Sequence, residues 1–308
     1  MANSAIDWDD LRLVHAVIAA GGLSAAARRL GSTQPTIGRR IQALEEKLGL
    51  VLFERRNEGY RPTAAATSLF PHLLRMAESA ALVQREIQVQ ADHGDGLVRV
   101  AGSSWIGRFL VERLARLRES LPGIEIAIDA DGRPPQLGTG DVHLAIFRAL
   151  PEQPGLKSRI VCRSNYAIYG ARNYVKAHPV AATDNRFTAC DWVIVDLERA
   201  PDGKRENWLS GKIGPKVQVL RTTTTATLLS ALEGGAGVGM LPCFVGDASE
   251  HLTRVSPVIP EMEHVYRLFL HQDIARAPRV RKTAEAIAAL FNADRALLLG
   301  SAAAKKGR

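Results

Sequence analysis

Apolar residues at helical spacing run through residues 8 to 30 and predict two short helices. The first has an apolar face formed by Trp8, Leu11, Val14 and Ile18. Gly21 and Gly22 end it, because glycine readily adopts the left-handed conformation that closes a helix. Ser24 is placed to cap the second helix, residues 25 to 30, with its hydroxyl.

Residues 34 to 48 predict a third helix with one apolar and one basic face. Thr33 is its expected N-cap, and Pro35 fits the first turn, where a missing amide costs no hydrogen bond. The inward stripe is Ile37, Ile41, Leu44 and Leu48, and the outer face with its flanks carries Pro35, Thr36, Gly38, Arg39, Arg40 and Gln42. Two short helices joined by a tight turn, the second basic on its outer face, are typical of the helix-turn-helix that places a helix in the DNA major groove.

A small hairpin and a long helix follow. The hairpin is predicted by Val51-Leu52-Phe53, a turn at Asn57-Glu58-Gly59, and Tyr60-Arg61, and it would be the wing of the DNA-binding unit. On residues 63 to 90 an apolar residue recurs every four then three positions, at Leu69, Leu73, Met76, Ala80, Val83 and Ile87. This coiled-coil seam, with a kink expected at Pro71, predicts dimerisation, although a helix buried inside a monomer would carry the same stripe. Residues 92 to 96 are expected to form a linker.

From residue 97 onward strands and helices alternate, which predicts a mainly parallel α/β sheet in two lobes. Strands are expected at residues 97–101, 124–129, 142–147, 192–195, 217–220, 238–241 and 266–270, with the pattern restarting near Tyr166. Helices are expected up to Ser120, up to Gly234-Gly235 and at residues 280–292, and residues 302–308 are expected to be a disordered basic tail.

The composition, 46% hydrophobic and 23% charged, is typical of a soluble globular protein. A net charge of +8 favours a polyanionic partner, although a solvated basic surface explains the same excess. Residues 1 to 10 lack the features of a secretory signal, and no apolar run is long enough to span a bilayer, so we expect a cytoplasmic protein without a membrane partner. Cys162, Cys190 and Cys243 lack disulfide or zinc-ligand spacing; we expect them reduced, and a redox role stays open.

Several motifs stand in a defined order along the chain. The N-terminal ones are Leu23-Ser24-Ala25-Ala26-Ala27-Arg28-Arg29-Leu30-Gly31, Gln34-Pro35-Thr36-Ile37-Gly38-Arg39-Arg40-Ile41, Leu44-Glu45 with Leu48-Gly49, Leu52-Phe53-Glu54-Arg55, and Arg61-Pro62-Thr63. Two looser stretches are Gly140-Asp141-Val142-His143-Leu144-Ala145-Ile146 and Gly235-Ala236-Gly237-Val238-Gly239-Met240-Leu241-Pro242. Together they resemble the LysR-type transcriptional regulators over almost the whole chain. The sequence departs from that family at Gly38, often serine, and at Ala64-Ala65-Ala66, where the family tends to have glycine.

The resemblance implies an α/β fold class with an N-terminal all-α winged helix-turn-helix, a long linker helix and a C-terminal two-lobed α/β sensor like the periplasmic binding proteins. The implied domains are a DNA-binding domain (1–62), a linker and dimerisation helix (63–92) and an effector-binding domain (93–308), with lobe one at 96–161 and 268–300 and lobe two at 162–267. The resemblance implies a sequence-specific transcription regulator that binds double-stranded operator DNA as a homodimer or homotetramer and responds to a small, anionic effector between the lobes. RNA polymerase is a further candidate partner, and no cofactor is expected.

Residues 28 to 61 contain eight Lys or Arg against four acidic residues, a surplus where the motif would meet DNA. By resemblance, the residues facing bases are Gln34, Pro35, Thr36 and Arg39. Those holding phosphate, backbone or minor groove are Ser24, Arg40, Arg55, Arg56 and Arg61. For any single arginine, a solvated surface charge is an equally good interpretation.

Ser103 and Ser104 follow the first strand and precede a helix, so their hydroxyls and the free amides there favour an anion, although helix capping explains them as well. The resemblance adds to the cleft Phe147, Arg148, Asp196, Thr223 and Thr224. Trp105 is expected to cover the ligand. Arg148 is expected either to clamp a charged ligand or to form a salt bridge between the lobes.

Other functions fit less well. Residues 102 to 107 read GxSxxG where a hydrolase elbow needs GxSxG, and no histidine is evidently placed as a base. The glycines of residues 235 to 239 run from a helix into a strand, the reverse of a dinucleotide loop. A transport-binding protein would share the sensor fold but carry a signal peptide and no helix-turn-helix. A ligand-independent repressor stays open.

Overall fold

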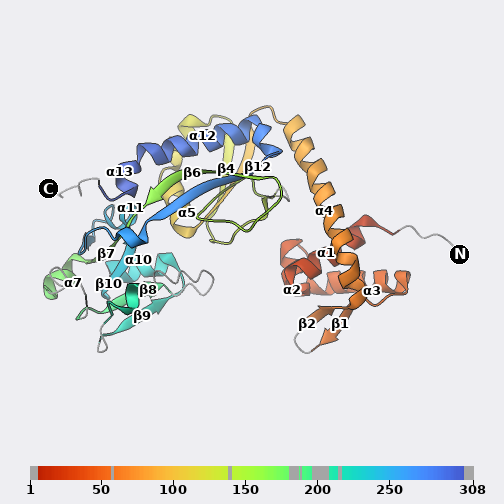
Figure 1. Cartoon of the computed structure of the whole chain (residues 1–308), viewed down its shortest axis with the longest axis horizontal. Coiled ribbons are helices and arrows are strands. Elements are labelled where there is room, and N and C mark those ends of the chain that lie inside the picture. Colours follow the sequence, from red (N-terminus) through yellow and green to blue (C-terminus); the bar gives the residue numbers. More distant parts are fainter. Residues whose placement is uncertain are drawn as a thin grey trace. The chain divides into compact units, whose positions relative to one another are not determined.

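The computed structural model describes residues 6–56, 59–137, 141–179, 187, 189–195, 208–213 and 217–301. It divides into two compact units, Met1–Ile87 and Gln88–Arg308 (Figure 1). The predicted turn residues Asn57 and Glu58 and the predicted tail at residues 302–308 lie outside the described residues.

Three helices, a hairpin and a long helix build the first unit, which we call the head. The helices are α1 (Trp8–Ala20), α2 (Leu23–Arg29) and α3 (Gln34–Leu48). An antiparallel hairpin of β1 (Phe53–Arg56) and β2 (Gly59–Pro62) follows, and α4 (Ala64–Gln90) continues the chain. The predicted succession of helices, wing and long helix is confirmed.

The core of the head is built on the predicted stripe of α3, because Ile37, Ile41 and Leu44 are each only 1% exposed. Thr33 caps α3 as predicted, since its hydroxyl accepts the N–H of Thr36. Packing on this stripe leaves the opposite face of α3 in solvent.

The predicted apolar face of α1 is wrong in part. The buried residues of this helix are Leu13, Val14, Ala16 and Val17, whereas Trp8, Leu11 and Ile18 are only half-buried. The helix packs against both α2 and α3, so its buried face turns toward the groove between them rather than following a single stripe.

The apolar stripe of α4 serves two different purposes. Leu73 is 3% exposed and belongs to the core of the head, and half-buried Leu69 packs on the same core. Farther along, Val83 and Ile87 are each 60% exposed. The stripe predicted as one coiled-coil seam therefore consists of a part that holds α4 on the head and an exposed part.

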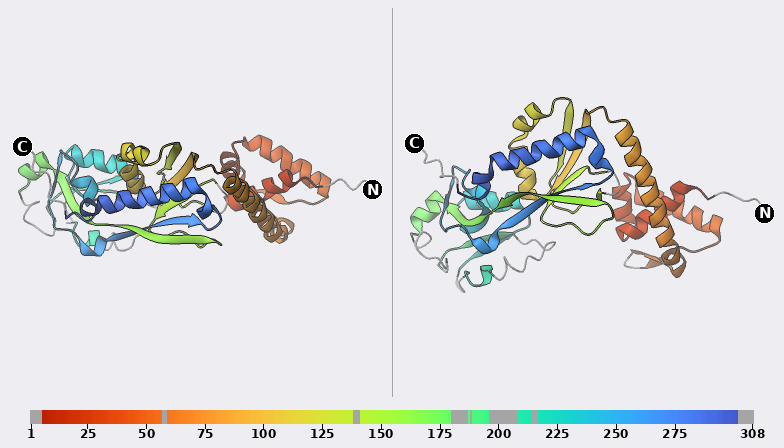
Figure 2. Two further views of the ribbon diagram at one scale, coloured as in Figure 1. Left: turned by 90° about the horizontal axis from the view of Figure 1, so that it is seen from above. Right: turned by 45° about the horizontal axis from the view of Figure 1, so that its top comes forward.

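A five-stranded sheet with the order β4-β3-β5-β12-β6 forms lobe one of the second unit. Its strands are β3 (Gly96–Gly102), β4 (Ile124–Asp129), β5 (Leu144–Phe147), β6 (Leu156–Ser164) and β12 (His264–His271). The helices that pack on it are α5 (Ser104–Val111), α6 (Leu114–Ser120) and the long α12 (Pro278–Ala293), which lies along the sheet (Figure 2). The single helix predicted up to Ser120 is thus two, separated at Glu112 and Arg113.

A second five-stranded sheet, with the order β11-β7-β10-β8-β9, forms lobe two. Its strands are β7 (Tyr166–Ala171), β8 (Trp192–Val195), β9 (Val219–Thr222), β10 (Val238–Pro242) and β11 (Leu252–Arg254). The remaining helices of the second unit are short. They are α7 (Arg172–Ala177), α10 (Thr225–Glu233), α11 (Cys243–Gly246), α13 (Arg295–Leu298) and the 3-10 turns η2 (Pro260–Met262) and η3 (Ile274–Arg276).

Both sheets are mixed, so the expectation of mainly parallel sheets is wrong. β3 runs parallel to β4 and β5, and β8 runs parallel to β9 and β10, as the βαβ rhythm predicts. β12 is antiparallel to β5 and β6, and β7 is antiparallel to β10 and β11. The antiparallel strands flank the points where the chain passes between the lobes, because a strand that follows a crossing enters its sheet from the opposite end.

The crossings lie close to where the sequence places them. β6 continues through Cys162 and Arg163 to Ser164, and β12 already begins at His264. The sequence pattern missed β6 because Lys157, Ser158 and Arg159 are all exposed, so this edge strand shows no buried alternation.

The three cysteines are free and buried. Burial raises the pKa of Cys162 to about 12 and also raises the pKa of Cys243. A thiol with a raised pKa is a poor nucleophile, so neither residue has the character of a redox sensor. Among the described residues, no single helix combines the length and apolarity needed to cross a membrane.

The segment predicted as a linker, residues 92 to 96, is held on the second unit by a buried carboxylate. The Asp92 side chain is fully buried; it accepts the N–H of Gly94 at 2.7 Å and pairs with the Arg279 guanidinium at 3.2 Å. Next to this pair, His143 is 3% exposed, and its Nδ1 accepts the backbone N–H of Arg99 at 2.9 Å. Burial, helped by Arg279 and Arg99 and opposed by Asp92, lowers the pKa of His143 to about 4.

Acid should therefore destabilise the second unit through His143. Between pH 6.5 and about 4 the unfolded chain binds a proton that the folded state excludes, so stability present at neutral pH is lost by roughly 3 kcal/mol as the pH falls. His143→Asn keeps an acceptor for Arg99 and does not titrate, so urea unfolding at about pH 7 and about pH 4.5 should differ less for this variant than for the native chain. Equal pH dependence in both proteins would contradict this assignment.

Candidate functional site

The outer face of α3 presents the side chains predicted to meet bases. Gln34, Pro35 and Arg39 are exposed, while Thr36 is half-buried beneath its contact with Thr33. Gly38 does not lie on an exposed flank, because it is buried and its Cβ position is 3.8 Å from Leu23. A serine would fit in that space, so packing alone does not demand glycine there.

Ser24 orients Gln34 instead of capping a helix. α2 begins at Leu23 with Gly22 at its N-cap, and the Ser24 hydroxyl donates to Oε1 of Gln34 at 2.8 Å. This bond satisfies the amide oxygen and leaves the amide NH2 group available to an acceptor on DNA. The predicted cap is wrong because the helix starts at Leu23, two residues earlier than expected.

Arg40 already has a partner within the head. Its guanidinium donates to Oδ1 of Asp10 on α1, at 2.6 Å from Nη2 and 3.2 Å from Nε. The pair is partly exposed and joins α3 to α1. A phosphate contact would have to compete with it, which sets Arg40 apart from exposed Arg39.

Glu45 fixes the wing relative to α3, a role the sequence reasoning missed. Its carboxylate accepts the backbone N–H groups of Leu52 and Phe53 at 2.6 and 2.9 Å. The Leu44-Glu45 motif marked this residue in the sequence, but its contact with the wing carries no periodic signal. On the wing, Arg61 is exposed and lies across from Glu54 in the strand register, while the side chains of Arg55 and Arg56 lie outside the described part of the structure.

In the second unit, Ser103 occupies the N-cap position of α5 without capping it. Its hydroxyl is buried and forms no hydrogen bond of standard geometry with any described residue. It lies close enough to the Tyr266 phenol to act on the pKa of that group. Ser104 opens α5 with its side chain next to Gly132, and Trp105 is half-buried against the core.

Next to Ser103 lies a cluster built around Tyr266, with Tyr166 and His264 from the two crossings and Arg148 directly after β5. Burial raises the pKa of Tyr266, against the effects of Tyr166, Ser103 and Arg148, which all favour the phenolate. The His264 ring packs on the Tyr166 ring with centroids 4.5 Å apart. Nη1 of Arg148 lies 3.2 Å from Nε2 of His264. Sequence reasoning named Arg148 but missed Tyr166, His264 and Tyr266, because only the paired crossings bring them to the end of β3.

The remaining predicted effector residues do not join this cluster in the described structure. Phe147 is 6% exposed and packs with Ala101 and Phe269. Thr224 caps α10 by accepting the N–H of Thr227 at 3.1 Å, and Thr223 is exposed just before it. Asp196 lies outside the described residues. No group of three or more His, Cys, Asp or Glu side chains in the described ranges is arranged to hold a metal ion.

A winged helix-turn-helix followed by a long helix and a two-lobed α/β domain is the architecture of a transcription regulator that binds DNA at one end and a small molecule at the other. Residues 8–67 match the family described as bacterial regulatory helix-turn-helix protein, lysR family, and residues 91–292 match the LysR substrate binding domain. The chain belongs to the LysR family and is a DNA-binding transcription regulator with a substrate-binding domain.

Similar proteins extend over most of the chain. The probable transcriptional regulator LrrA of Synechococcus elongatus is 26% identical over 293 residues, covering 89% of this chain and 98% of LrrA. The regulator TdfR of Cupriavidus pinatubonensis is 28% identical over 286 residues, 90% and 96% of the two chains.

Solved structures share the fold. The full-length virulence activator AphB of Vibrio cholerae has a TM-score of 0.59 at 18% identity, over 92% of this chain and 98% of AphB. Full-length CbnR in complex with its target DNA has a TM-score of 0.54 at 22% identity, over 92% and 100% of the two chains.

The contacts of the side chains on and around α3 predict how much each contributes to DNA affinity. Gln34→Ala and Arg39→Ala should each weaken specific binding by about 1–3 kcal/mol if they reach base edges. Ser24→Ala should weaken DNA binding by about 1 kcal/mol, because the Gln34 amide loses its partner. Arg40→Ala should weaken binding less than Arg39→Ala, because Arg40 is already paired with Asp10. Titration of a duplex selected from a random-sequence pool measures this order, with Arg12→Ala on α1 as a matched loss of charge. Wild-type affinity for both Gln34→Ala and Arg39→Ala would refute the proposed base-reading face.

Proposed function

We propose that the protein binds operator DNA as a dimer and that a small anionic ligand, held between the lobes of its second unit, changes that binding. The observation that carries the ligand site is the Ser103 hydroxyl, which occupies a helix N-cap, is buried and does not cap. The observation that supports the DNA site is the exposed face of α3, oriented by the Ser24–Gln34 bond.

The exposed apolar part of α4 supports the dimer. Val83 and Ile87 are each 60% exposed, and Leu82 is 50% exposed. Isolated side chains of this kind are common on surfaces, but a contiguous row at helical spacing calls for a partner. Closer to the head, a groove of about 460 Å³ is lined by Trp8, His72, Arg75, Met76 and Ser79, so the apolar surface of α4 continues along the helix. A second copy of the same helix is the occupant that matches this surface in both shape and length.

Replacing Val83 and Ile87 together with Lys should abolish the dimer, because four like charges would meet in the seam of two paired helices. Leu73 is unsuitable for this test, since it is 3% exposed in the core of the head and its replacement would unfold that unit. Light scattering reports the oligomer, and far-ultraviolet circular dichroism checks that α4 still folds. Replacing the exposed Glu86 by Lys is the matched control on the same helix. An unchanged oligomer in the double variant would rule out this seam.

The proposal of an anionic ligand rests on the groups near Ser103. The guanidinium of Arg148 lies at the end of β5 beside His264, and the first amides of α5 add the positive end of a helix dipole. Tyr266 supplies an aromatic ring with a polar tip next to the same hydroxyl, and Tyr166 contacts Tyr266. A carboxylate on a small organic body matches this combination of cation, free amides and rings.

A panel of small carboxylic acids, each paired with its uncharged amide, tests this site by thermal shift of the full chain. At least one acid should stabilise the protein while its amide does not, and Arg148→Gln should abolish the effect. Ser103→Ala should weaken binding by about one to two decades, since a bond to a charged group is worth about 1.5–3 kcal/mol, and Ser104→Ala should act in the same direction. Ser158→Ala, at an exposed position on β6, is the control. Amides that bind as tightly as acids would overturn the anionic assignment, and operator binding unaffected by any bound acid would favour a ligand-independent repressor.

A further inference from the structure

The C-terminal turn, residues 295–301, lies where the chain passes between the two lobes. The first crossing is at Asn165, between β6 and β7, and the second is at residues 255–263, between β11 and β12. We propose that this turn is a hinge brace, which binds the first crossing and the residue that directly precedes the second, and thereby restrains rotation of one lobe against the other. The inference rests on the proposed effector site only for its consequence, namely how readily a ligand changes the arrangement of the lobes.

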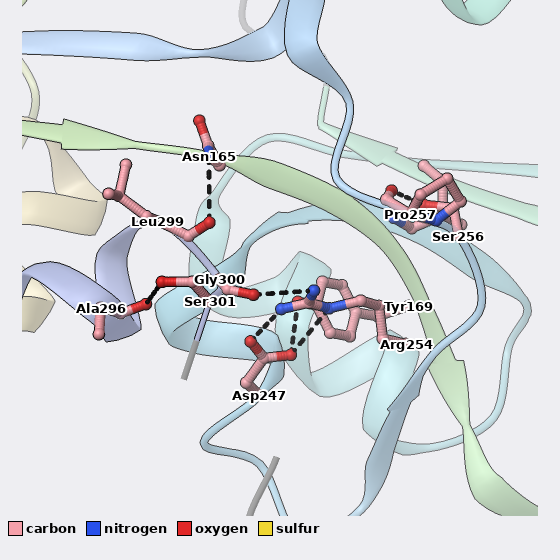
Figure 3. Close-up of polar contacts among 11 residues, drawn as sticks. Asn165, Tyr169, Asp247, Arg254, Ser256, Pro257, Ala296, Leu299, Gly300 and Ser301 are labelled. Atoms are coloured by element: carbon pink, nitrogen blue, oxygen red, sulfur yellow. Dashed lines mark hydrogen bonds and ion pairs between the residues drawn. The ribbon is translucent and has the colours of Figure 1, made fainter. Parts of the chain in front are cut away.

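The brace holds the first crossing through Asn165 (Figure 3). The backbone N–H of Asn165 donates to the carbonyl of Leu298, and its side-chain Nδ2 donates to the carbonyl of Leu299, both at 3.0 Å. Carbonyls at the end of a helix have no partner inside it, so Asn165 satisfies two such groups at once. The Asn165 carbonyl in turn accepts the N–H of Cys243 at 2.8 Å, which ties this crossing to lobe two.

On the other side the brace binds Arg254, the last residue of β11, which directly precedes the second crossing. Nη1 of Arg254 donates to the carbonyl of Gly300 at 3.1 Å. The same guanidinium pairs with Asp247, whose side chain is 6% exposed, and the Tyr169 hydroxyl donates to Asp247 at 2.8 Å (Figure 3). A buried pair keeps its geometry because loss of either member leaves the other charge unpaired, so the Gly300 carbonyl is bound to a rigid group.

Gly300 fits the brace against lobe two. Its φ of +67° is in the left-handed region, which favours glycine. A Cβ there would lie 2.7 Å from Sγ of Cys243 and 2.8 Å from Nη2 of Arg254, closer than atoms can approach. The turn therefore lies against the Arg254 cluster with no room for a side chain.

The packing of the brace on β6 is less complete. Leu298 is 1% exposed, yet a cavity of about 200 Å³ lies beside it between β6 and the end of α12, with Val161, Cys162 and Phe291 in its lining. The brace accordingly acts through directed hydrogen bonds to Asn165 and Arg254 more than through close packing along β6.

Distances between the lobes test the brace without any effector. Spin labels at Glu119→Cys on α6 and Ser230→Cys on α10, both exposed, report the separation of the lobes, and the native cysteines are buried. The full chain is labelled and diluted with unlabelled chain, so that only distances within one chain are measured. Gly300→Ala should broaden the distribution, and so should the milder Arg254→Lys, which keeps a charge beside Asp247. Amides of both crossings should exchange with solvent roughly tenfold faster, as expected for the loss of one or two hydrogen bonds.

The matched control is Gly123→Ala in lobe one. Gly123 has a φ of +77°, so an alanine costs similar backbone strain, but its Cβ position lies 3.4 Å from Asp95 and away from both crossings. An unchanged distance distribution in Gly300→Ala and Arg254→Lys would overturn the brace. A distribution that broadens equally in the Gly123→Ala control would also overturn it, since the effect would then be general loosening. Because no ligand is added, either result stands apart from the outcome of the carboxylate panel.

Discussion

The second unit depends on an aromatic contact that joins its two sheets into one core. Phe109 of α5 stacks on Phe291 of α12 with ring centroids 4.8 Å apart and meets Phe244 of α11 edge to face at 5.4 Å. All three rings are at most 1% exposed, so this contact has the density of a protein interior rather than of a loose domain interface. The helix α5 carries the proposed ligand groups at its N-terminal end and Phe109 in its last turn.

Two kinds of contact around this aromatic core hold the lobes together: apolar packing and directed hydrogen bonds. Apolar packing opposes separation of the lobes without directional preference, whereas Asn165 and Arg254 bind the C-terminal turn through directed hydrogen bonds. The cluster around Tyr266 differs from both, because it combines a buried phenol with Arg148 and a serine hydroxyl that has no standard bond.

The head is organised around α3, whose buried face is apolar and whose exposed face carries the side chains proposed to read DNA. Polar contacts there position side chains rather than stabilise the fold: Ser24 orients Gln34, Asp10 engages Arg40, and Glu45 holds the wing. Exposed pairs of this kind contribute little to the stability of the fold, so their main effect is to orient the side chains. The same distinction divides α4, whose stripe packs on the head at Leu73 and is exposed at Val83.

The sequence by itself determined the order of elements, the stripe of α3 and the succession of strands in the second unit, because apolar periodicity reports which face of an element is buried. It named Ser103 from its place after the first strand, and the family resemblance added Arg148. Tertiary structure alone decided what those faces meet: which half of the α4 stripe is buried, that Ser24 bonds Gln34, and that β7 and β12 run antiparallel to their neighbours. Tyr166 and His264 gather around Tyr266, the neighbour of Ser103, only because the two crossings pair residues about a hundred positions apart, and such long-range partners have no period in the sequence.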